Sequence, residues 1–192
     1  MKKGKKAFYL VGVDEVGRGA LAGPVVAAAV GIWTDQNFKQ FNFPDSKKLS
    51  PKKRAEIAKF LKQNLKWSIG KTSLKEIEKL GIGKATKLAL ERAIKNLIKI
   101  SKKPDHLFID AIFLPNLKLP QTPIIKGDEK CPIIACASII AKVFRDTLMK
   151  RYDKKFPQYG FAKNKGYGTK FHKMMIKKYG ISKIHRKNFK LK

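Results

Sequence analysis

Apolar runs separated by short polar turns predict a set of strands along the first two thirds of the chain. Four segments have the length and composition of buried strands: residues 8–13, 25–33, 66–71 and 106–109. The first two are joined through an acidic turn and Pro24, which leaves too few residues for a crossover helix. We therefore expect a mixed sheet rather than a purely parallel one.

Helical periodicity fills the intervals between these strands. Ser50 and Pro51 suit an N-cap and a first helical position, and Ser73-Leu74-Lys75-Glu76 is a capping box that opens a short helix before a longer one. The first of these helices has an apolar stripe formed by Ala55, Ala58, Leu61 and Leu65. From Pro132 to Ala141 the chain is apolar nearly all round, which predicts the most buried helix. Strands alternating with helices indicate an α/β protein.

The length of 192 residues predicts one domain over 1–192, with a basic helical C-terminal part from about residue 150. The 44 Lys and Arg residues far outnumber the 14 Asp and Glu residues, giving a net charge of +30. A nucleic acid would relieve the repulsion among these cations, so we expect a polyanionic partner. The alternative is a general lysine bias that covers the whole surface equally.

Location follows from what the sequence lacks. The basic start, residues 1–6, precedes an apolar run too short for a secretory signal, and no stretch has the ~18 apolar residues of a membrane span. Cys131 and Cys136 have no nearby ligand to complete a zinc site, so we expect reduced structural thiols. We therefore expect a cytoplasmic protein that does not contact a membrane. We also expect it to be a monomer.

Carboxylates stand at strand ends, in a chain where they are scarce. Asp14 and Glu15 follow the first apolar run, Asp110 ends another, and Asp128 lies in the turn after Ile124-Ile125. Strand ends near one edge of an α/β sheet converge, and gathered carboxylates repel one another unless cations neutralise them. Two Mg²⁺ or Mn²⁺ ions would do so and would suit phosphodiester hydrolysis.

Each acid also has a simpler interpretation. Asp110 could cap the next turn, Asp128 could cap the helix after Pro132, and Glu15 could pair with a lysine. Neighbouring strand residues point to opposite faces, so Asp14 and Glu15 reach one cluster only if the strand bends at once. The Gly17-Arg18-Gly19 turn would permit that bend.

The residues 12–27 resemble the signature of the bacterial ribonuclease HII family. Other blocks match that family in the same order, over nearly the whole chain from residue 11 to 189: 45–50, 109–111, 126–128, 137–143, 145–146, 165–169 and 185–186. The resemblance implies a ribonuclease H-like fold, with a five-stranded mixed sheet flanked by helices and a small helical C-terminal part. It implies a metal-dependent endoribonuclease that cuts RNA paired with DNA or embedded in it, leaving 3′-hydroxyl and 5′-phosphate ends.

The resemblance also assigns roles to residues. It places the metal-binding, catalytic acids at Asp14, Glu15, Asp110 and Asp128. The ribonucleotide-reading turn maps onto Gly17, Arg18 and Gly19, whose backbone would bind the 2′-hydroxyl. The sugar-stacking tyrosine maps onto Tyr167. The sequence departs from the usual family pattern at Val16, Ala20, Gly81 and Cys136.

Two interpretations remain open for several residues. Lys47 suits a phosphate contact or simple solvation, and Tyr167, set between two glycines, suits stacking better than core filling. Arg145 and Asp146 suggest an internal ion pair, with Asp146 as a metal ligand the alternative. His106, His172 and His185 are expected to be structural, and the pair His185-Arg186 to secure the C-terminal segment.

Three functions compete at this stage. The leading one is an endoribonuclease for RNA–DNA hybrids and single ribonucleotides in duplex DNA, cutting on the 5′ side of the ribonucleotide by two-metal hydrolysis. A non-catalytic basic RNA-binding protein would explain the charge but not the acids at strand ends. A metal nuclease without RNA specificity would not need the Gly-Arg-Gly turn or Tyr167. The sequence does not choose between Mg²⁺ and Mn²⁺.

Overall fold

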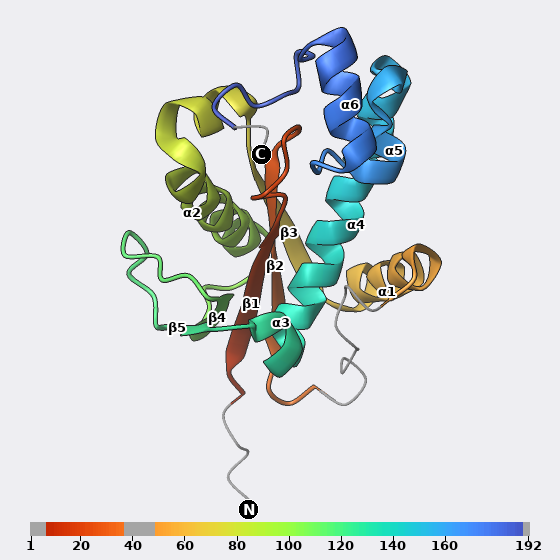
Figure 1. Cartoon of the computed structure of the whole chain (residues 1–192). Coiled ribbons are helices and arrows are strands. Elements are labelled where there is room, and N and C mark those ends of the chain that lie inside the picture. The colour runs from red at the N-terminus through yellow and green to blue at the C-terminus, as the bar shows by residue number, and fades with distance from the viewer. Residues whose placement is uncertain (1–6, 37–48, 190–192) are drawn as a thin grey trace, which may run out of the picture.

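The central strand β1 organises the fold. The protein's structure, a computed structural model, describes residues 7–36 and 49–189. Within them β1 (Tyr9–Val16) pairs antiparallel with β2 (Val25–Trp33), which pairs antiparallel with β3 (Lys66–Thr72). On its other side β1 has a parallel partner, so the sheet is mixed, as predicted from the short β1–β2 connection (Figure 1).

Two parallel strands complete the sheet. β4 (His106–Asp110) lies beside β1, and β5 (Gln121–Ile124) forms the edge, giving the order β3-β2-β1-β4-β5. The hydrophobic pattern predicted four of these strands. It did not predict β5, because Pro123 interrupts that segment and a proline fits a strand only at an edge such as this one. The five strands implied by the family resemblance are confirmed.

Helices cover both faces of the sheet (Figure 1). α2 (Leu74–Ile100) packs on one face, while α1 (Pro51–Asn64) and α4 (Pro132–Lys155) pack on the other. Alternation along the strands separates the two cores: Val11 and Val13 face α2, and Ala28 and Val30 of β2 face α1 and α4. Asp14, paired with Ala28, therefore lies on the α4 side.

The predicted helix starts are present. The Ser50 side chain accepts from the Lys53 amide, and Ser73 and Glu76 cap each other's amides. Gly81, at φ +73°, kinks α2 between the predicted short and long helices. The predicted stripe of α1 was wrong at one position: Ala55 is exposed, and the face turned to the core is completed by Ile57.

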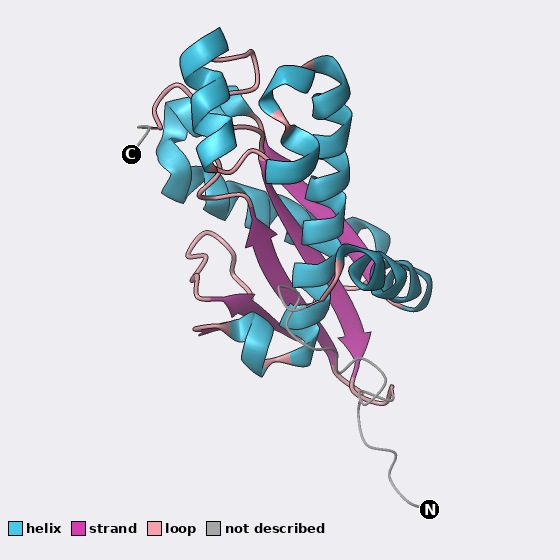
Figure 2. Cartoon of the chain, turned by 45° about the vertical axis from the view of Figure 1, so that its right-hand side comes forward, coloured by secondary structure: helices cyan, strands magenta, loops and turns pink. Residues whose placement is uncertain are grey.

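The C-terminal part packs against one end of the sheet (Figure 2). It contains a 3-10 turn (Pro157–Tyr159), α5 (Phe161–Asn164) and α6 (Lys170–Tyr179). Ala22, in the loop after β1, forms an isolated bridge with His185. A separate apolar cluster joins that loop to α4, α5 and α6. Nowhere in residues 7–36 and 49–189 does a helix combine the length and apolar character of a membrane span.

Candidate active site

A cavity of about 240 Å³ opens at the end of the sheet where β1 gives way to its loop. Residues distant in sequence line it: Asp14, Glu15, Val16, Asp110, Asp128, Ser138, Lys142 and Tyr167. They come from β1, β4, a short helix α3 (Gly127–Lys130), α4 and the segment before α6. The structure therefore brings all four predicted acids and the predicted stacking tyrosine to one place.

Asp14 and Glu15 reach this cavity without the immediate bend that we expected. β1 keeps its register with β2 through Val16, and the turn begins only at Gly17. The expectation was wrong because the cavity lies across the end of the sheet rather than over one face. Side chains from both faces can therefore line it.

Burial sets the electrostatics of the first two acids. It is the largest cause that raises the pKa of Asp14 well above its usual value, and the charges of Glu15 and Asp110 raise that pKa further. Hydrogen bonds from Ser138 and from the Glu15 amide, whose nitrogen lies 2.6 Å from Asp14 Oδ1, act in the opposite direction. The two acids and Asp110 thus form a cluster with excess negative charge.

The pKa of Glu15 is raised in the same way. Burial raises its pKa most, and Arg18, whose Nη1 lies 3.2 Å from Glu15 Oε1, lowers it. The simple alternative of a cation pair is therefore partly realised, by an arginine rather than a lysine. The second oxygen, Oε2, is buried and finds no hydrogen-bond partner among the described residues. An unsatisfied carboxylate oxygen in a cavity is typical of a ligand site.

A hydrogen bond places the other two acids together. Asp110 Oδ1 accepts from the Gly127 amide at 2.7 Å, so the end of β4 secures the first residue of α3. Asp128 follows directly in that helix and is 6% exposed. The N-cap position of α4 is Cys131 rather than Asp128. Asp110 thus holds the start of α3 and not the turn that directly follows it.

Backbone strain gathers around these residues. Among the described residues, positive φ outside glycine occurs at Ala111, Lys126 and Lys165. These positions lie one or two residues from Asp110, Asp128 and Tyr167, respectively. Such conformations cost about 1–3 kcal/mol each and concentrate at functional sites. The strain supports the cavity as the functional centre.

The predicted substrate-binding residues divide into three groups. Gly17 to Gly19 form the turn after β1, with Arg18 half exposed at its tip. Tyr167 is half-buried, and its ring lies 5.3 Å from Arg145 Cζ and 5.9 Å from Lys142 Nζ. Lys47 lies outside the described residues, so its role stays a prediction.

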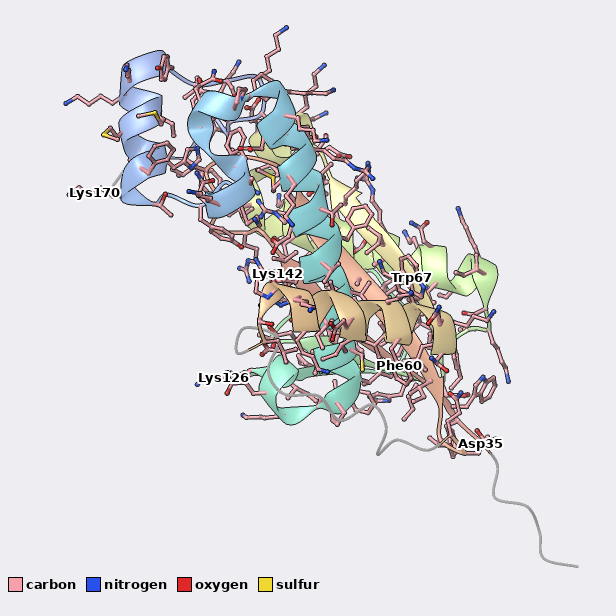
Figure 3. All side chains as sticks on the ribbon, turned by 90° about the vertical axis from the view of Figure 1, so that its right-hand side faces the viewer. Asp35, Phe60, Trp67, Lys126, Lys142 and Lys170 are labelled. Atoms are coloured by element: carbon pink, nitrogen blue, oxygen red, sulfur yellow. The ribbon has the colours of Figure 1, made fainter. Side chains whose placement is uncertain are left out.

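Besides Val16, two polar residues of the cavity were not predicted as site residues. Ser138 and Lys142 lie one turn apart on α4, and Lys142 stands between Lys170 and Lys126 in Figure 3. The i, i+4 spacing of two polar residues within an otherwise apolar helix was the signal that could have identified them.

The predicted ion pair between Arg145 and Asp146 was wrong. Asp146 accepts from Lys142 Nζ at 2.9 Å and lines a different hollow, between α1 and α4. Adjacent helical residues point about 100° apart, so the i, i+4 partner is the better placed of the two. That position also removes the alternative of Asp146 as a ligand in the cavity.

Within the described part of the chain, no three His, Cys, Asp or Glu side chains already form a metal-binding group. Asp14, Glu15 and Asp110 instead each accept a hydrogen bond from a donor of the protein. The acids share one cavity but are not drawn together around a common centre.

Comparisons with known proteins agree with this geometry. The sequence model of the family Ribonuclease HII matches residues 11–192. Ribonuclease HII of Clostridioides difficile strain 630 is 48% identical over 96% of this chain and 71% of its own length. The enzyme of Pelagibacter ubique strain HTCC1062 is 49% identical over 94% of this chain and 95% of its own. The chain belongs to the ribonuclease HII family. It is accordingly a nuclease that acts on phosphodiester bonds.

A solved structure gives the same result for the fold of this ribonuclease HII. The crystal structure of ribonuclease H2 from Pyrococcus horikoshii OT3 superimposes with a TM-score of 0.79 at 25% identity, over 95% of this chain and 94% of that one. The predicted ribonuclease H-like fold is confirmed.

Proposed function

We propose that this ribonuclease HII cuts the RNA strand of RNA–DNA hybrids and cuts on the 5′ side of single ribonucleotides embedded in duplex DNA. The products are a 3′-hydroxyl and a 5′-phosphate. The observation that carries the proposal is the shared cavity, which four acids and Tyr167 line together and whose β1 residues lead directly into the Gly17–Gly19 turn. One wall suits the phosphodiester and the other suits a sugar.

The acids fit two divalent cations. Carboxylate oxygens are the ligands that Mg²⁺ and Mn²⁺ prefer. The unpartnered Oε2 of Glu15 and the raised pKa of Asp14 show a cluster that lacks positive charge. Asp14, Glu15, Asp110 and Asp128 would hold the ions. Bound there, the ions would activate a water and stabilise the leaving oxygen.

Gly17 and Gly19 differ in why each is a glycine. Gly17 has φ +95°, and a Cβ there would lie 2.2 Å from Arg145 Nε, so the fold itself requires glycine. A Cβ on Gly19 would meet nothing within 4 Å, and its φ is not positive. No internal contact explains glycine at 19. A ligand that approaches the backbone closely does, and a ribose 2′-hydroxyl is such a ligand.

Tyr167 reads the neighbouring nucleotide in this proposal. Its ring lines the cavity and belongs to none of the three apolar clusters. A deoxyribose leaves a flatter surface for a ring than a ribose does. The turn and Tyr167 together therefore favour a ribonucleotide followed by a deoxyribonucleotide.

The competing functions explain less. A non-catalytic RNA-binding protein does not need acids with an unsatisfied oxygen in a cavity. A nuclease without RNA specificity does not need an open glycine at 19. The net charge of +30 supports duplex binding under all three.

The test uses labelled duplexes that contain one ribonucleotide or none, with Mg²⁺ or Mn²⁺ and with chelator. We expect one cut, 5′ of the ribonucleotide, only with metal, and no cut in the all-DNA duplex. Tyr167→Ala should reduce the preference for the junction more than it reduces duplex affinity. Equal cleavage of both duplexes would favour the general nuclease.

A further inference from the structure

Two buried arginines, Arg145 and Arg186, are held by backbone carbonyls rather than by carboxylates. Arg145 of α4 is fully buried and Arg186 is 3% exposed. In residues 7–36 and 49–189 neither forms a salt bridge. Burial lowers the pKa of Arg186 to about 9, which still leaves it protonated at neutral pH. Two buried cations are costly unless hydrogen bonds satisfy them, so their partners indicate what they are for.

Arg186 binds the backbone of the loop after β1. Its Nη2 donates to the Gly17 carbonyl at 2.6 Å and its Nη1 to the Arg18 carbonyl at 2.7 Å. Its Nε and Nη2 donate to the Gly23 carbonyl at 2.9 and 2.8 Å. One side chain thus holds both ends of the loop, and a planar guanidinium fixes the direction of each carbonyl.

These bonds determine where the amides of the turn point. A trans peptide directs its C=O and its N–H in opposite directions, and the described residues have no cis peptide. Since the carbonyls of Gly17 and Arg18 point to Arg186, the N–H groups of Arg18 and Gly19 point away from it. Neither N–H has a hydrogen-bond partner among the described residues. Both are available to a ligand.

Arg145 connects the same loop to Tyr167. Its Nε donates to the Pro24 carbonyl at 3.1 Å and its Nη2 to the Ala22 carbonyl at 3.0 Å. Its Nη1 donates to the Lys165 carbonyl at 2.9 Å, and its Cζ lies 5.3 Å from the centre of the Tyr167 ring. The second arginine therefore links the loop that carries the turn with the segment that carries the tyrosine.

We propose that Arg186 and Arg145 are positioning residues for ribonucleotide specificity. Arg186 directs the amides of the Gly17–Gly19 turn outward, and Arg145 keeps Tyr167 in register with that turn. This inference rests on the proposed function, because it assigns the recognition of a ribonucleotide to the same two features. Neither arginine touches the substrate in this arrangement.

The experiment compares affinities without chemistry. Wild type and Arg186→Lys bind a duplex with one ribonucleotide and the matched all-DNA duplex in chelator. Lysine keeps the charge but cannot make the planar set of bonds. We expect wild type to prefer the ribonucleotide duplex about tenfold, the size of one hydrogen bond. Arg186→Lys should bring this ratio near one and leave affinity for the all-DNA duplex unchanged.

Arg54→Lys is the matched control. Arg54 is also buried, at 8% exposure, and also donates to a backbone carbonyl, that of Leu49 at 2.7 Å. It lies on α1, away from the turn, so its substitution should keep the preference of wild type. If the buried arginines only stabilised the fold, Arg186→Lys and Arg54→Lys would both melt at a lower temperature. Both would then keep the wild-type ratio of affinities for the two duplexes.

A second readout separates this inference from the proposed function. Amide NMR signals of Gly19 and Tyr167 should shift together in Arg186→Lys and in Arg145→Lys, and stay in place in Arg54→Lys. If wild type shows no preference for the ribonucleotide, the proposed function fails, and the NMR signals still test the positioning. If wild type shows the preference and Arg186→Lys retains it, or if the signals do not move, the positioning role is overturned.

Discussion

Buried charge is satisfied differently in two adjacent regions: the acids that line the cavity, called the acid wall, and the loop after β1 with the two arginines that hold it, called the loop wall. On the acid wall, Asp14 and Glu15 have raised pKa values, and one oxygen of Glu15 has no partner in the described structure. On the loop wall, Arg145 and Arg186 are as deeply buried, yet the carbonyl oxygens around them accept from every guanidinium nitrogen. The acid wall keeps a buried oxygen without a partner among the described residues, whereas the two guanidinium groups of the loop wall are hydrogen-bonded by the protein itself and only the outward N–H groups of Arg18 and Gly19 are left for a ligand.

Because of this difference, the two regions suit different tasks. A wall that is already satisfied can hold backbone amides in fixed directions, which recognition requires. A wall with unbalanced charge gains stabilisation when cations bind, so its charge serves the chemistry. Substitutions in the two walls should therefore have different signatures.

The largest effect is expected on the acid wall. Asp110→Asn keeps an oxygen that can accept from the Gly127 amide but removes the charge. Cleavage should fall about 10³-fold or more, equivalent to about 4 kcal/mol of transition-state stabilisation. The metal-free protein should keep or gain thermal stability, because Asp110 is one of the like charges that raise the pKa of Asp14. Single-turnover cleavage and thermal melting measure the two effects.

Asp105→Asn is the control for that substitution. Asp105 precedes the same strand at its other end, where it accepts from the Tyr9 amide at 2.7 Å. Its loss should leave the cleavage rate unchanged. Near-normal turnover of Asp110→Asn in Mg²⁺ would instead remove Asp110 from the catalytic acids.

Two glycine substitutions in the loop wall should have different effects, one on folding and the other on recognition. Gly17→Ala places a Cβ 2.2 Å from Arg145 Nε at φ +95°, and should cost about 1–3 kcal/mol of folding free energy. Gly19→Ala meets no neighbour and should change stability by about 0.5 kcal/mol or less. Only Gly19→Ala should lose ribonucleotide cleavage in a fully stable protein. Chemical denaturation and the duplex assay test both, and full activity of Gly19→Ala would contradict close approach of a sugar.

An effect on stability alone, and not on cleavage at neutral pH, is expected from two buried histidines behind Tyr167. His172 Nδ1 lies 2.8 Å from the Tyr167 carbonyl, which can only accept, and the amide of Ser182, which can only donate, lies 2.8 Å from His185 Nδ1. The two Nε2 atoms are 3.0 Å apart, so His185 donates and His172 accepts. Both rings are therefore neutral in the folded protein. Burial lowers the pKa of both, that of His185 to about 4.

The sign of the pH effect follows from this neutral pair. Between pH 6.5 and 4 the unfolded chain binds the proton and the folded protein does not, so stability is full above 6.5 and falls with acid. The loss should reach about 2–3 kcal/mol at pH 4. Urea unfolding at several pH values should show the advantage of wild type over His185→Gln shrinking with acid. His106→Gln is the control, and a difference that stays constant with pH would contradict the neutral pair.

The sequence predicted most of the fold because its signals were local. Four strands, the Ser73–Glu76 capping box and the buried helix from Pro132 follow from periodicity and helix-end chemistry within a few residues. β5 was missed because a strand with a proline is stabilised by its neighbour β4 rather than by its own composition. Ala55 was misplaced because a stripe of alanines does not fix the rotation of a helix.

Site residues could be predicted where the residue type itself indicates the chemistry. They could not be predicted where a contact joins residues that are far apart in the sequence. Acids at strand ends identified Asp14, Glu15, Asp110 and Asp128 as one group, and the cavity contains all four. The partners of Arg145 are backbone carbonyls 20 to 123 residues away. No pattern in the sequence distinguishes those carbonyls from others, so the adjacent Asp146 was the natural but wrong partner.

The bond between Arg186 and the Gly17 carbonyl spans 169 residues and has a consequence for synthesis. β1 leaves the ribosome early and can pair with β2 at once, because only a short loop separates them. The turn at its end has to wait until residue 186 has been made and released. During translation strands β1 and β2 can therefore pair before the turn is fixed, and under the proposed function the turn could read a ribonucleotide only after residue 186 has been released.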